Sequence, residues 1–380
     1  MRKPGALIFL CYMACALCSV TAASAQNAPA AGKTAEQQFK NIQVLKGAPA
    51  EQVIPTMQYF NASLGVECDF CHVRQQTLEP AKDDKKEKLT ARKMIEMTES
   101  INRANFEGKP EVGCGTCHTG KTHPSAASSL FDVNNPAAHE ANRHDQAHQE
   151  LPSAEQIEAA YEKAIGGHDA IQKLTTRSAK ATVKTFQGQT FQMESLAKAP
   201  DLAVTDSKLP NGQQREQGFD GKTAWTKGNR GVNEAAGPEL ASIRISARFD
   251  RDLMPLAAFV NTRVVGMDKV DGKDCYVVRG VHADNTFSER LYFDKESGLL
   301  LRRVFQQRTL FGSLTDATDY SDYKEVNGVK VAFTTRRTNA ETVLTRTLDS
   351  VAFNKPLDAG RFAVPAATEA KPAGAEGKKD

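Results

Sequence analysis

Residues 68–72 read Cys-Asp-Phe-Cys-His, and residues 114–118 read Cys-Gly-Thr-Cys-His. Both are C-x-x-C-H, the attachment signature of c-type haem, in which two thiols bond to the porphyrin and the adjacent imidazole binds the iron. The sequence therefore predicts two covalently bound haem c groups. Their attachment residues are Cys68, Cys71, Cys114 and Cys117, and the iron ligands on one face are His72 and His118.

A four-thiolate zinc site is the main alternative for two C-x-x-C pairs. The pairs of a zinc ribbon are separated by about 15–20 residues, whereas 42 residues lie between Cys71 and Cys114. Zinc gives no reason for a histidine directly after each pair, and a thioredoxin-like pair would need a βαβ context. Haem attachment therefore explains the two motifs better than either alternative.

The two motifs do not show which group occupies the second axial position of each haem iron. A methionine there raises the reduction potential, and an open position permits peroxide chemistry. Met57 lies 11 residues before Cys68, on a predicted helix, and Met94 lies 20 residues before Cys114. Met97 is the substitute for Met94, and plain packing is the alternative for each methionine. The rival histidines nearby are His123, His139, His144 and His148.

Residues 1–25 have the organisation of a cleaved export signal. Arg2 and Lys3 precede an apolar stretch that ends near Val20, and Ala23-Ser24-Ala25 has the A-x-A pattern of a cleavage site. A membrane anchor would need about 20 apolar residues, and the cysteines here lack the usual lipoprotein approach sequence. We therefore expect a periplasmic protein without a transmembrane segment in the mature chain.

The composition is that of an ordinary globular protein. The chain has 380 residues, 40% hydrophobic and 25% charged, which fits two domains. A net charge of +3 gives no argument for nucleic acid. The predicted organisation is a signal peptide (1–25), a flexible leader (26–33), a diheme cytochrome domain (34–122), a linker (123–150), a β-rich domain (151–365) and a disordered tail (366–380).

Helical patterns dominate the first domain. A capping box at Thr34 and Gln37 predicts a helix that includes Phe39 and ends before Gly47. A second helix should begin near Pro55 and end at Gly65, and a third should cover residues 90–102. The charged stretch 75–88 is predicted to be a solvated loop.

From residue 179 onward the pattern alternates and predicts strands. Twelve short apolar-polar runs occur between residues 179 and 353, and turn pairs such as Asp271-Gly272 and Asn327-Gly328 separate several of them. A capped helix from Ser153 to Gly166 precedes the strands, and further helix is expected near residues 238–260. The fold class is therefore multidomain: an α-helical diheme domain, then an α+β domain with a large curved antiparallel sheet.

Residues 37–122 resemble the cytochrome c subunit of photosynthetic reaction centres. The resemblance rests on residues 41–47 (NIQVLKG), Met57, residues 63–72 (SLGVECDFCH), residues 91–94 (ARKM) and residues 112–118 (VGCGTCH). It implies that Met57 and Met94 are the sixth ligands of the first and second haem. The full subunit of that family has four haems, whereas this chain has two motifs, and the resemblance does not imply photosynthesis.

The β-rich domain resembles, more weakly, the periplasmic lipoprotein-carrier fold, through residues 320–330 (YSDYKEVNGVK) and 354–358 (NKPLD). That fold implies a sheet that can enclose acyl chains, with a filled docking domain as the alternative. Together the patterns predict an electron carrier, not an enzyme, that serves redox partner proteins as electron donor and acceptor. The alternatives are a diheme peroxidase with an open haem, and a lipid- or lipoprotein-binding module with accessory haems.

Overall fold

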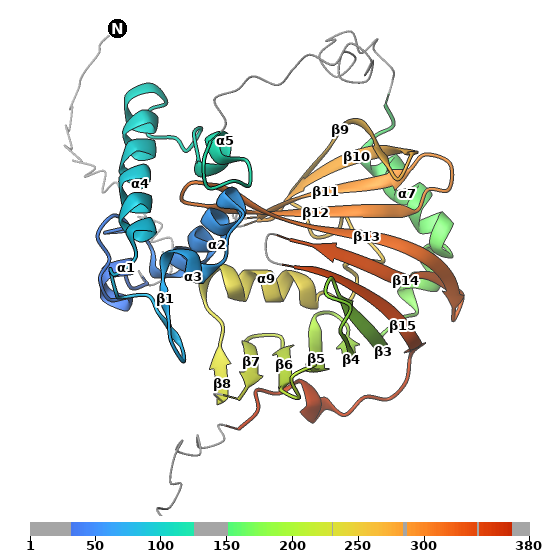
Figure 1. The fold of residues 1–380 in the computed structure, drawn as a ribbon. Helices are drawn as coiled ribbons and strands as arrows, with labels where there is room; N and C mark the ends of the chain where they lie inside the picture. The colour runs from blue at the N-terminus through green and yellow to red at the C-terminus, as the bar shows by residue number, and fades with distance from the viewer. Residues whose placement is uncertain (1–31, 125–150, 230, 284–286, 340–341, 367–380) are drawn as a thin grey trace, which may run out of the picture.

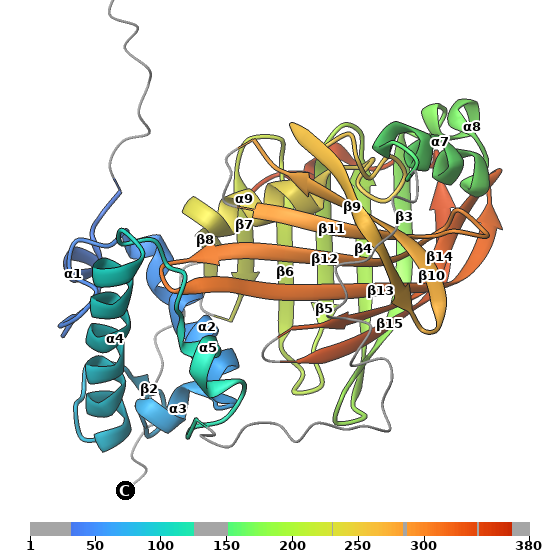
Figure 2. The ribbon, with the colours of Figure 1, turned by 90° about the horizontal axis from the view of Figure 1, so that it is seen from above.

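The computed structural model describes residues 32–124, 151–229, 231–283, 287–339 and 342–366. The predicted signal peptide, residues 26–31 of the leader, residues 125–150 of the linker and residues 367–380 of the tail lie outside these ranges. Helices of the N-terminal part lie at one end of a large curved sheet (Figures 1 and 2). Among the described residues, no helix is both long and apolar enough to cross a membrane.

One open antiparallel sheet of 13 strands makes up most of the C-terminal part. Its order is β8-β7-β6-β5-β4-β3-β15-β14-β13-β12-β11-β10-β9, so two meanders meet where β3 pairs with β15. The strands are β3 (Thr176–Thr185), β4 (Thr190–Lys198), β5 (Leu202–Lys208), β6 (Gln214–Phe219), β7 (Ala224–Gly228), β8 (Gly231–Glu234), β9 (Asn261–Val270), β10 (Lys273–Val281), β11 (Phe287–Asp294), β12 (Leu300–Thr309), β13 (Gly312–Val326), β14 (Val329–Thr338) and β15 (Val343–Phe353).

The turn chemistry explains why these strands pair in register. Asp271 and Asn327 adopt φ of 49° and 53°, and the following Gly272 and Gly328 adopt 81° and 80°. Two successive residues with positive φ make the twisted two-residue turns that join β9 to β10 and β13 to β14. All twelve predicted strands are present. The short edge strand β8 was not predicted, because its four residues contain a single apolar side chain, Val232.

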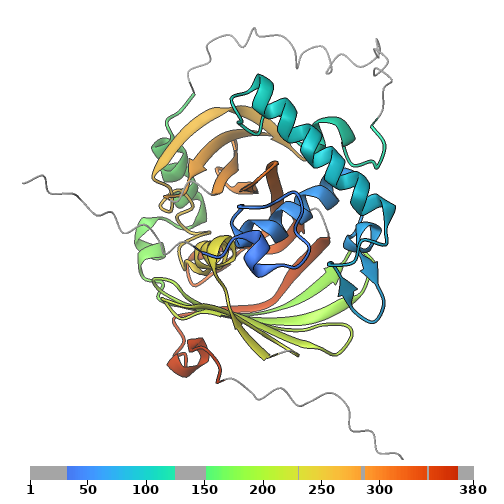
Figure 3. The same ribbon diagram turned by 90° about the vertical axis from the view of Figure 1, so that its left-hand side faces the viewer.

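Helices occupy both ends of the sheet. At one end, the capping box of Ser153 and Gln156 begins α7 (Ala154–Ile165), which is followed by α8 (His168–Gln172). Tyr161 and Ile165 of α7 are 2% and 0% exposed in the apolar core over the sheet. The sheet also curls around α9 (Gly237–Ala247), as Figure 3 shows.

The N-terminal part is built from short helices. They are α1 (Ala35–Gln38), η1 (Ala50–Gln52), α2 (Val53–Leu64), α3 (Cys68–Cys71), α4 (Lys86–Asn105) and α5 (Cys114–His118), with the two-stranded β1 (Val73–Arg74) and β2 (Leu78–Glu79); η2 (Ala359–Phe362) follows the sheet. The predicted helix at Thr34 is shorter than expected, because Phe39 is already extended and Asn41 has a positive φ of 61°.

The stretch 75–88 is not wholly a solvated loop, as the sequence had predicted. It contains β2, and the ammonium of Lys88 is buried against two carbonyl groups, of Pro80 and Lys82, at 2.7 Å each. The polar composition of the stretch therefore serves internal hydrogen bonds. The predicted helix at residues 90–102 is longer than expected and begins at Lys86.

The hairpin between β12 and β13 connects the sheet to the N-terminal helices. Its tip residue Phe311 is 4% exposed and packs against Phe60 of α2, with ring centroids 5.4 Å apart. Around this pair lies one apolar cluster that includes Leu45, Val53 and Ile95. Burial of a phenylalanine stabilises by about 1.5–3 kcal/mol, so this contact holds the two parts together.

A buried ionic cluster lies on the inner face of β11 and β12. Glu289 and Arg303 are 1% and 2% exposed and form a close carboxylate–guanidinium pair. Arg251 and His282 also reach Glu289, at 3.3 and 3.0 Å. Burial alone raises the pKa of Glu289, but the charges of Arg303 and Arg251 outweigh it, so the pKa falls well below its ordinary value. Glu289 is therefore ionised in the folded protein.

Substitution Glu289→Gln is expected to lower the free energy of unfolding by about 3–5 kcal/mol, because it removes the close, buried counter-charge of Arg303 and leaves only Asp252 at 3.3 Å. A carboxylate whose pKa is depressed by folding contributes stability above its unfolded pKa, and this is lost as the pH falls. Below about pH 4.5, denaturant unfolding should therefore show a weaker pH dependence in the variant than in the wild type. The exposed Glu325→Gln serves as control and should change little; an equal loss in both variants would contradict the assignment.

Candidate haem-attachment site

The first C-x-x-C-H segment begins directly after α2. Gly65 ends that helix with φ of 66°, and α3, which contains both cysteines, begins three residues later at Cys68. The amide of His72 donates to the carbonyl of Cys68 at 3.0 Å, and the amide nitrogen of the Asn61 side chain lies 3.4 Å from the Cys68 sulfur. One helical turn thus places two thiols and an imidazole on a single short segment, which is what thioether attachment beside an axial histidine requires.

His72 has the protonation chemistry of an iron ligand. Burial is the largest cause that lowers its pKa, the charge of Lys88 lowers it further, and the Pro80 carbonyl opposes both. The imidazole is therefore neutral at physiological pH, as metal binding requires. Its Nδ1 is buried without a hydrogen bond from any residue that the structure describes.

The second C-x-x-C-H segment is α5, whose first turn is closed by a hydrogen bond of 3.1 Å from the Gly113 amide to the Thr116 hydroxyl. Nδ1 of His118 lies 2.9 Å from the Lys121 carbonyl. Because a carbonyl can only accept, Nδ1 must donate the proton, and Nε2 keeps its lone pair. A hydrogen bond of this kind fixes the tautomer and orientation of histidines that bind metals.

Each attachment segment packs against the helix that precedes the other one. For α5 the support is α2: the Gly115 amide donates to the Tyr59 hydroxyl at 3.3 Å, and the Gly120 amide donates to the Ser63 carbonyl at 2.8 Å. For α3 the support is α4 and the turn before it, where Lys85 donates to the Asp69 carbonyl. The two segments are therefore held in one unit and not in two independent ones.

The candidate methionines differ in exposure. Met57 lies on α2 at the edge of the apolar cluster around Phe60, and Met94 lies half-buried on α4. Met97 is one turn away and 46% exposed. Of the two methionines on α4, Met94 is thus the more buried one.

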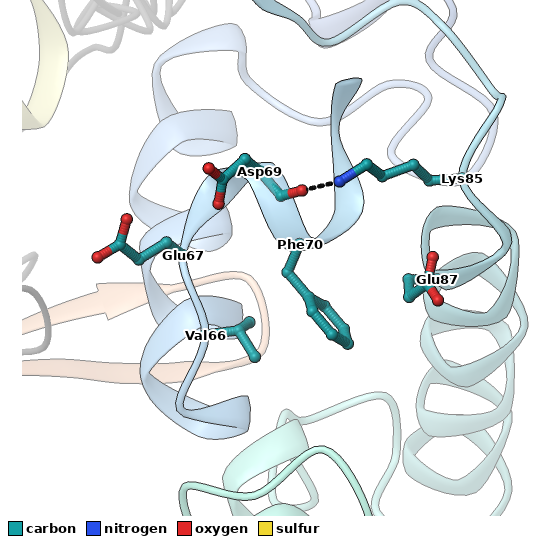
Figure 4. A pocket seen from close by; sticks show the side chains of 6 residues that line it. All are labelled: Val66, Glu67, Asp69, Phe70, Lys85 and Glu87. Atoms are coloured by element: carbon teal, nitrogen blue, oxygen red, sulfur yellow. Dashed lines mark hydrogen bonds between the residues drawn. The ribbon is translucent and has the colours of Figure 1, made fainter. Parts of the chain in front are cut away.

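A surface cavity of about 550 Å³ lies between α3 and α4. Val66, Glu67, Asp69, Phe70, Lys85 and Glu87 line it, and the Phe70 ring, 38% exposed, points into the space between the two helices (Figure 4). An apolar ring next to Cys71 suits contact with the face or edge of a porphyrin. Two of the six lining side chains, Val66 and Phe70, are apolar, and the other four are charged.

The cysteine chemistry also fits haem better than the zinc alternative. All four motif cysteines are free, and among the described residues no group of three or more metal-binding side chains comes together. Burial raises the pKa of Cys71, and raises that of Cys114 to about 11. Two C-x-x-C pairs that do not come together do not make a tetrahedral four-thiolate site. Each pair does have its histidine beside it, as haem c requires.

The comparison with protein families agrees with this geometry. Residues 13–179 match the family model described as photosynthetic reaction centre cytochrome C subunit. This part of the chain has the sequence pattern of that family, which implies covalently bound haem c. The chain is also 33% identical over 97 residues to cytochrome c-554 of Chloroflexus aurantiacus. That alignment covers 23% of this chain and 23% of the relative, so the chain spans about a quarter of that protein's length.

Solved structures also resemble this chain. A DUF1329 family protein from Desulfovibrio piger and a LolA superfamily protein from Nitrosomonas europaea each align with 56% of this chain and 98% of their own. Both are 11% identical to it, with a TM-score of 0.41.

The predicted cysteines, His72, His118, Met57 and Met94 all lie in the N-terminal helical unit. Met57 is on α2 and Met94 is on α4. Of the rival histidines, His123 is exposed, and His139, His144 and His148 lie outside the described residues. The sequence did not indicate the supporting roles of Tyr59 or of the Lys121 carbonyl. Tyr59 lies two residues after Met57 on the same helix. Its position in the sequence does not show which other segment its side chain contacts.

Substitution Gly65→Ala is expected to separate α2 from the second attachment segment, because a Cβ at Gly65 would lie 2.3 Å from the Gly120 carbonyl oxygen. Gly47→Ala is the matched control: its φ is 78°, close to that of Gly65, but its Cβ would meet no atom within 4 Å. Both variants should lose about 1 kcal/mol from backbone strain, and Gly65→Ala about 1–3 kcal/mol more from the clash. Equal losses in chemical unfolding would contradict this packing.

Proposed function

We propose that this chain is a periplasmic diheme c-type cytochrome that transfers electrons between redox partner proteins. The observation that carries the proposal is that both C-x-x-C-H segments lie in one unit, each with an imidazole suited to bind iron. His72 is kept neutral by burial, and His118 is held by the Lys121 carbonyl with Nε2 available. The family match over residues 13–179 supports the same function.

The ligand set favours a carrier over an enzyme. Haem c, when bound, supplies one-electron transfer. The chain would bind it through the thiols of Cys68 and Cys71 and those of Cys114 and Cys117, with His72 and His118 on one side of each iron. Met57 and Met94 would occupy the opposite sides. If both axial positions are filled by protein, substrate has no coordination site, so peroxidase activity is not expected.

Haem stoichiometry tests the proposal directly. Protein purified from the periplasmic fraction of cells that make haem c should contain two haems per chain, which remain attached in denaturant. The double variants Cys68→Ala/Cys71→Ala and Cys114→Ala/Cys117→Ala should each retain one haem. Purified protein without covalent haem would contradict the proposal. One haem per wild-type chain would show that the protein is a monohaem cytochrome.

Substitution Met94→Leu should remove the weak far-red absorption band of one methionine–iron bond and lower the potential of one haem, since methionine ligation raises it. Met57→Leu should do the same for the other haem. Met97→Leu is the matched control on α4, because its side chain is 46% exposed whereas that of Met94 is half-buried. If Met97→Leu removes the band and Met94→Leu does not, the two residues exchange roles.

In this proposal the sheet serves as a docking domain and not as a lipid carrier. The hairpin between β12 and β13 holds α2 through Phe311, and the region between α7 and the sheet is filled by packed apolar side chains. The prediction of a lipid or lipoprotein ligand is tested by organic extraction and mass spectrometry of the purified protein. Stoichiometric lipid in the extract would give the sheet a carrier function, and its absence would leave the docking role.

A further inference from the structure

A second cavity, of about 340 Å³, lies where α2 meets the inner face of the sheet. Gln58 contributes from α2, Ser242 and Ser246 contribute from α9, and the remaining walls come from β12, β13, β14 and the residues next to them. This volume is at the lower end of the range for small-molecule sites. The cavity contains none of the cysteines, histidines or methionines assigned to haem, so it is a separate site.

Three guanidinium groups line this cavity, namely those of Arg251, Arg303 and Arg337. Arg303 donates hydrogen bonds to Glu289, to the Tyr320 hydroxyl and to the Arg251 carbonyl. Arg251 donates to Glu289 at 3.3 Å, but its Nε is buried and donates to no described residue. A buried donor of this kind costs free energy unless something bonds it. The guanidinium of this cavity-lining residue therefore keeps a donor that is not bonded by any described residue.

The outer end of the cavity is open to solvent. The side chain of Arg337 is 56% exposed and pairs with the carboxylate of Asp316 from the neighbouring strand β13. Phe305 and Leu314 provide an apolar wall beside these charges, and the Phe305 ring stacks on Phe287 with centroids 4.9 Å apart. The cavity thus combines guanidinium groups with a fixed apolar surface.

The charge around the cavity favours an anion. Three arginines line it, Arg251, Arg303 and Arg337, and two more that do not line it, Arg177 and Arg346, surround Asp252. They face three carboxylates, Asp252, Glu289 and Asp316. The group therefore has a net charge of +2, and a ligand with one or two negative charges would neutralise it without removing an existing ion pair.

We propose that this cavity binds a small organic acid, whose carboxylate is held by Arg251 and Arg337 and whose carbon skeleton packs on Phe305 and Leu314. Guanidinium is the side-chain group that best matches a planar carboxylate. The apolar wall favours an organic acid over inorganic phosphate. The proposal is independent of the haem function, since an apolar-walled anion site needs no haem.

Titration calorimetry of the full-length protein with succinate, benzoate and inorganic phosphate at constant ionic strength tests the proposal. Succinate or benzoate should bind saturably with one site per chain and more tightly than phosphate. Arg337→Gln should weaken this binding about tenfold, the loss of one charge-assisted hydrogen bond. Arg251→Lys should weaken it similarly, because lysine keeps the charge near Glu289 but has no Nε donor.

Arg336→Gln is the matched control. Arg336 is adjacent on β14, and its side chain is 55% exposed against 56% for Arg337, but it pairs with Asp319 and does not line the cavity. It should leave the affinity unchanged. Equal weakening in Arg336→Gln and Arg337→Gln would overturn the placement, since net charge alone would then explain it. Phosphate binding as tight as succinate, or no binding stronger than a Kd of about 1 mM, would overturn the organic-acid assignment.

Discussion

The packing of Phe60 against Phe311 is the contact on which the arrangement of the whole protein depends. It inserts the tip of a sheet hairpin into the small apolar cluster of the N-terminal helices. The cluster contains few residues, so without Phe311 it would bury little apolar surface by itself, and small cores are marginal in stability. The sheet thereby supplies part of the core that the attachment unit needs.

Helix α2 transmits this support to both proposed haems. One side of it packs on the hairpin, and Met57 is half-buried at the edge of the same cluster. Tyr59 and Ser63 bond the second attachment segment, and Gly65 permits its close approach. A displacement of α2 would therefore change both the proposed ligand of the first haem and the support of the second. Such shared support explains how two haems could keep a constant relative position, which efficient electron transfer between them requires.

The inner face of the sheet has two kinds of surface. Near α7 it is covered by an apolar core that contains Tyr161 and Phe293, with ring centroids 5.5 Å apart. Near α2 and α9 it contains the ion cluster of Glu289 and Arg303 and the cavity beyond it. An ion pair this deeply buried is weak evidence for added stability, because desolvation offsets most of its attraction. Its position beside the cavity agrees with the proposed organic-acid site, because ligand recognition needs charges in fixed positions.

The sequence by itself determined the attachment chemistry and the local structure. The C-x-x-C-H spacing defines four thiols and two imidazoles, and strand alternation with pairs such as Asp271-Gly272 and Asn327-Gly328 gave every long strand of the sheet, because these signals act over a few residues. Tertiary structure decided the rest. That Phe311 completes the cluster around Phe60, that His118 bonds the Lys121 carbonyl, and that Met94 is half-buried while Met97 is exposed all depend on which surfaces meet. The same holds for Arg251, Arg303 and Arg337, which lie far apart along the chain and line one cavity, so no local pattern could have marked them.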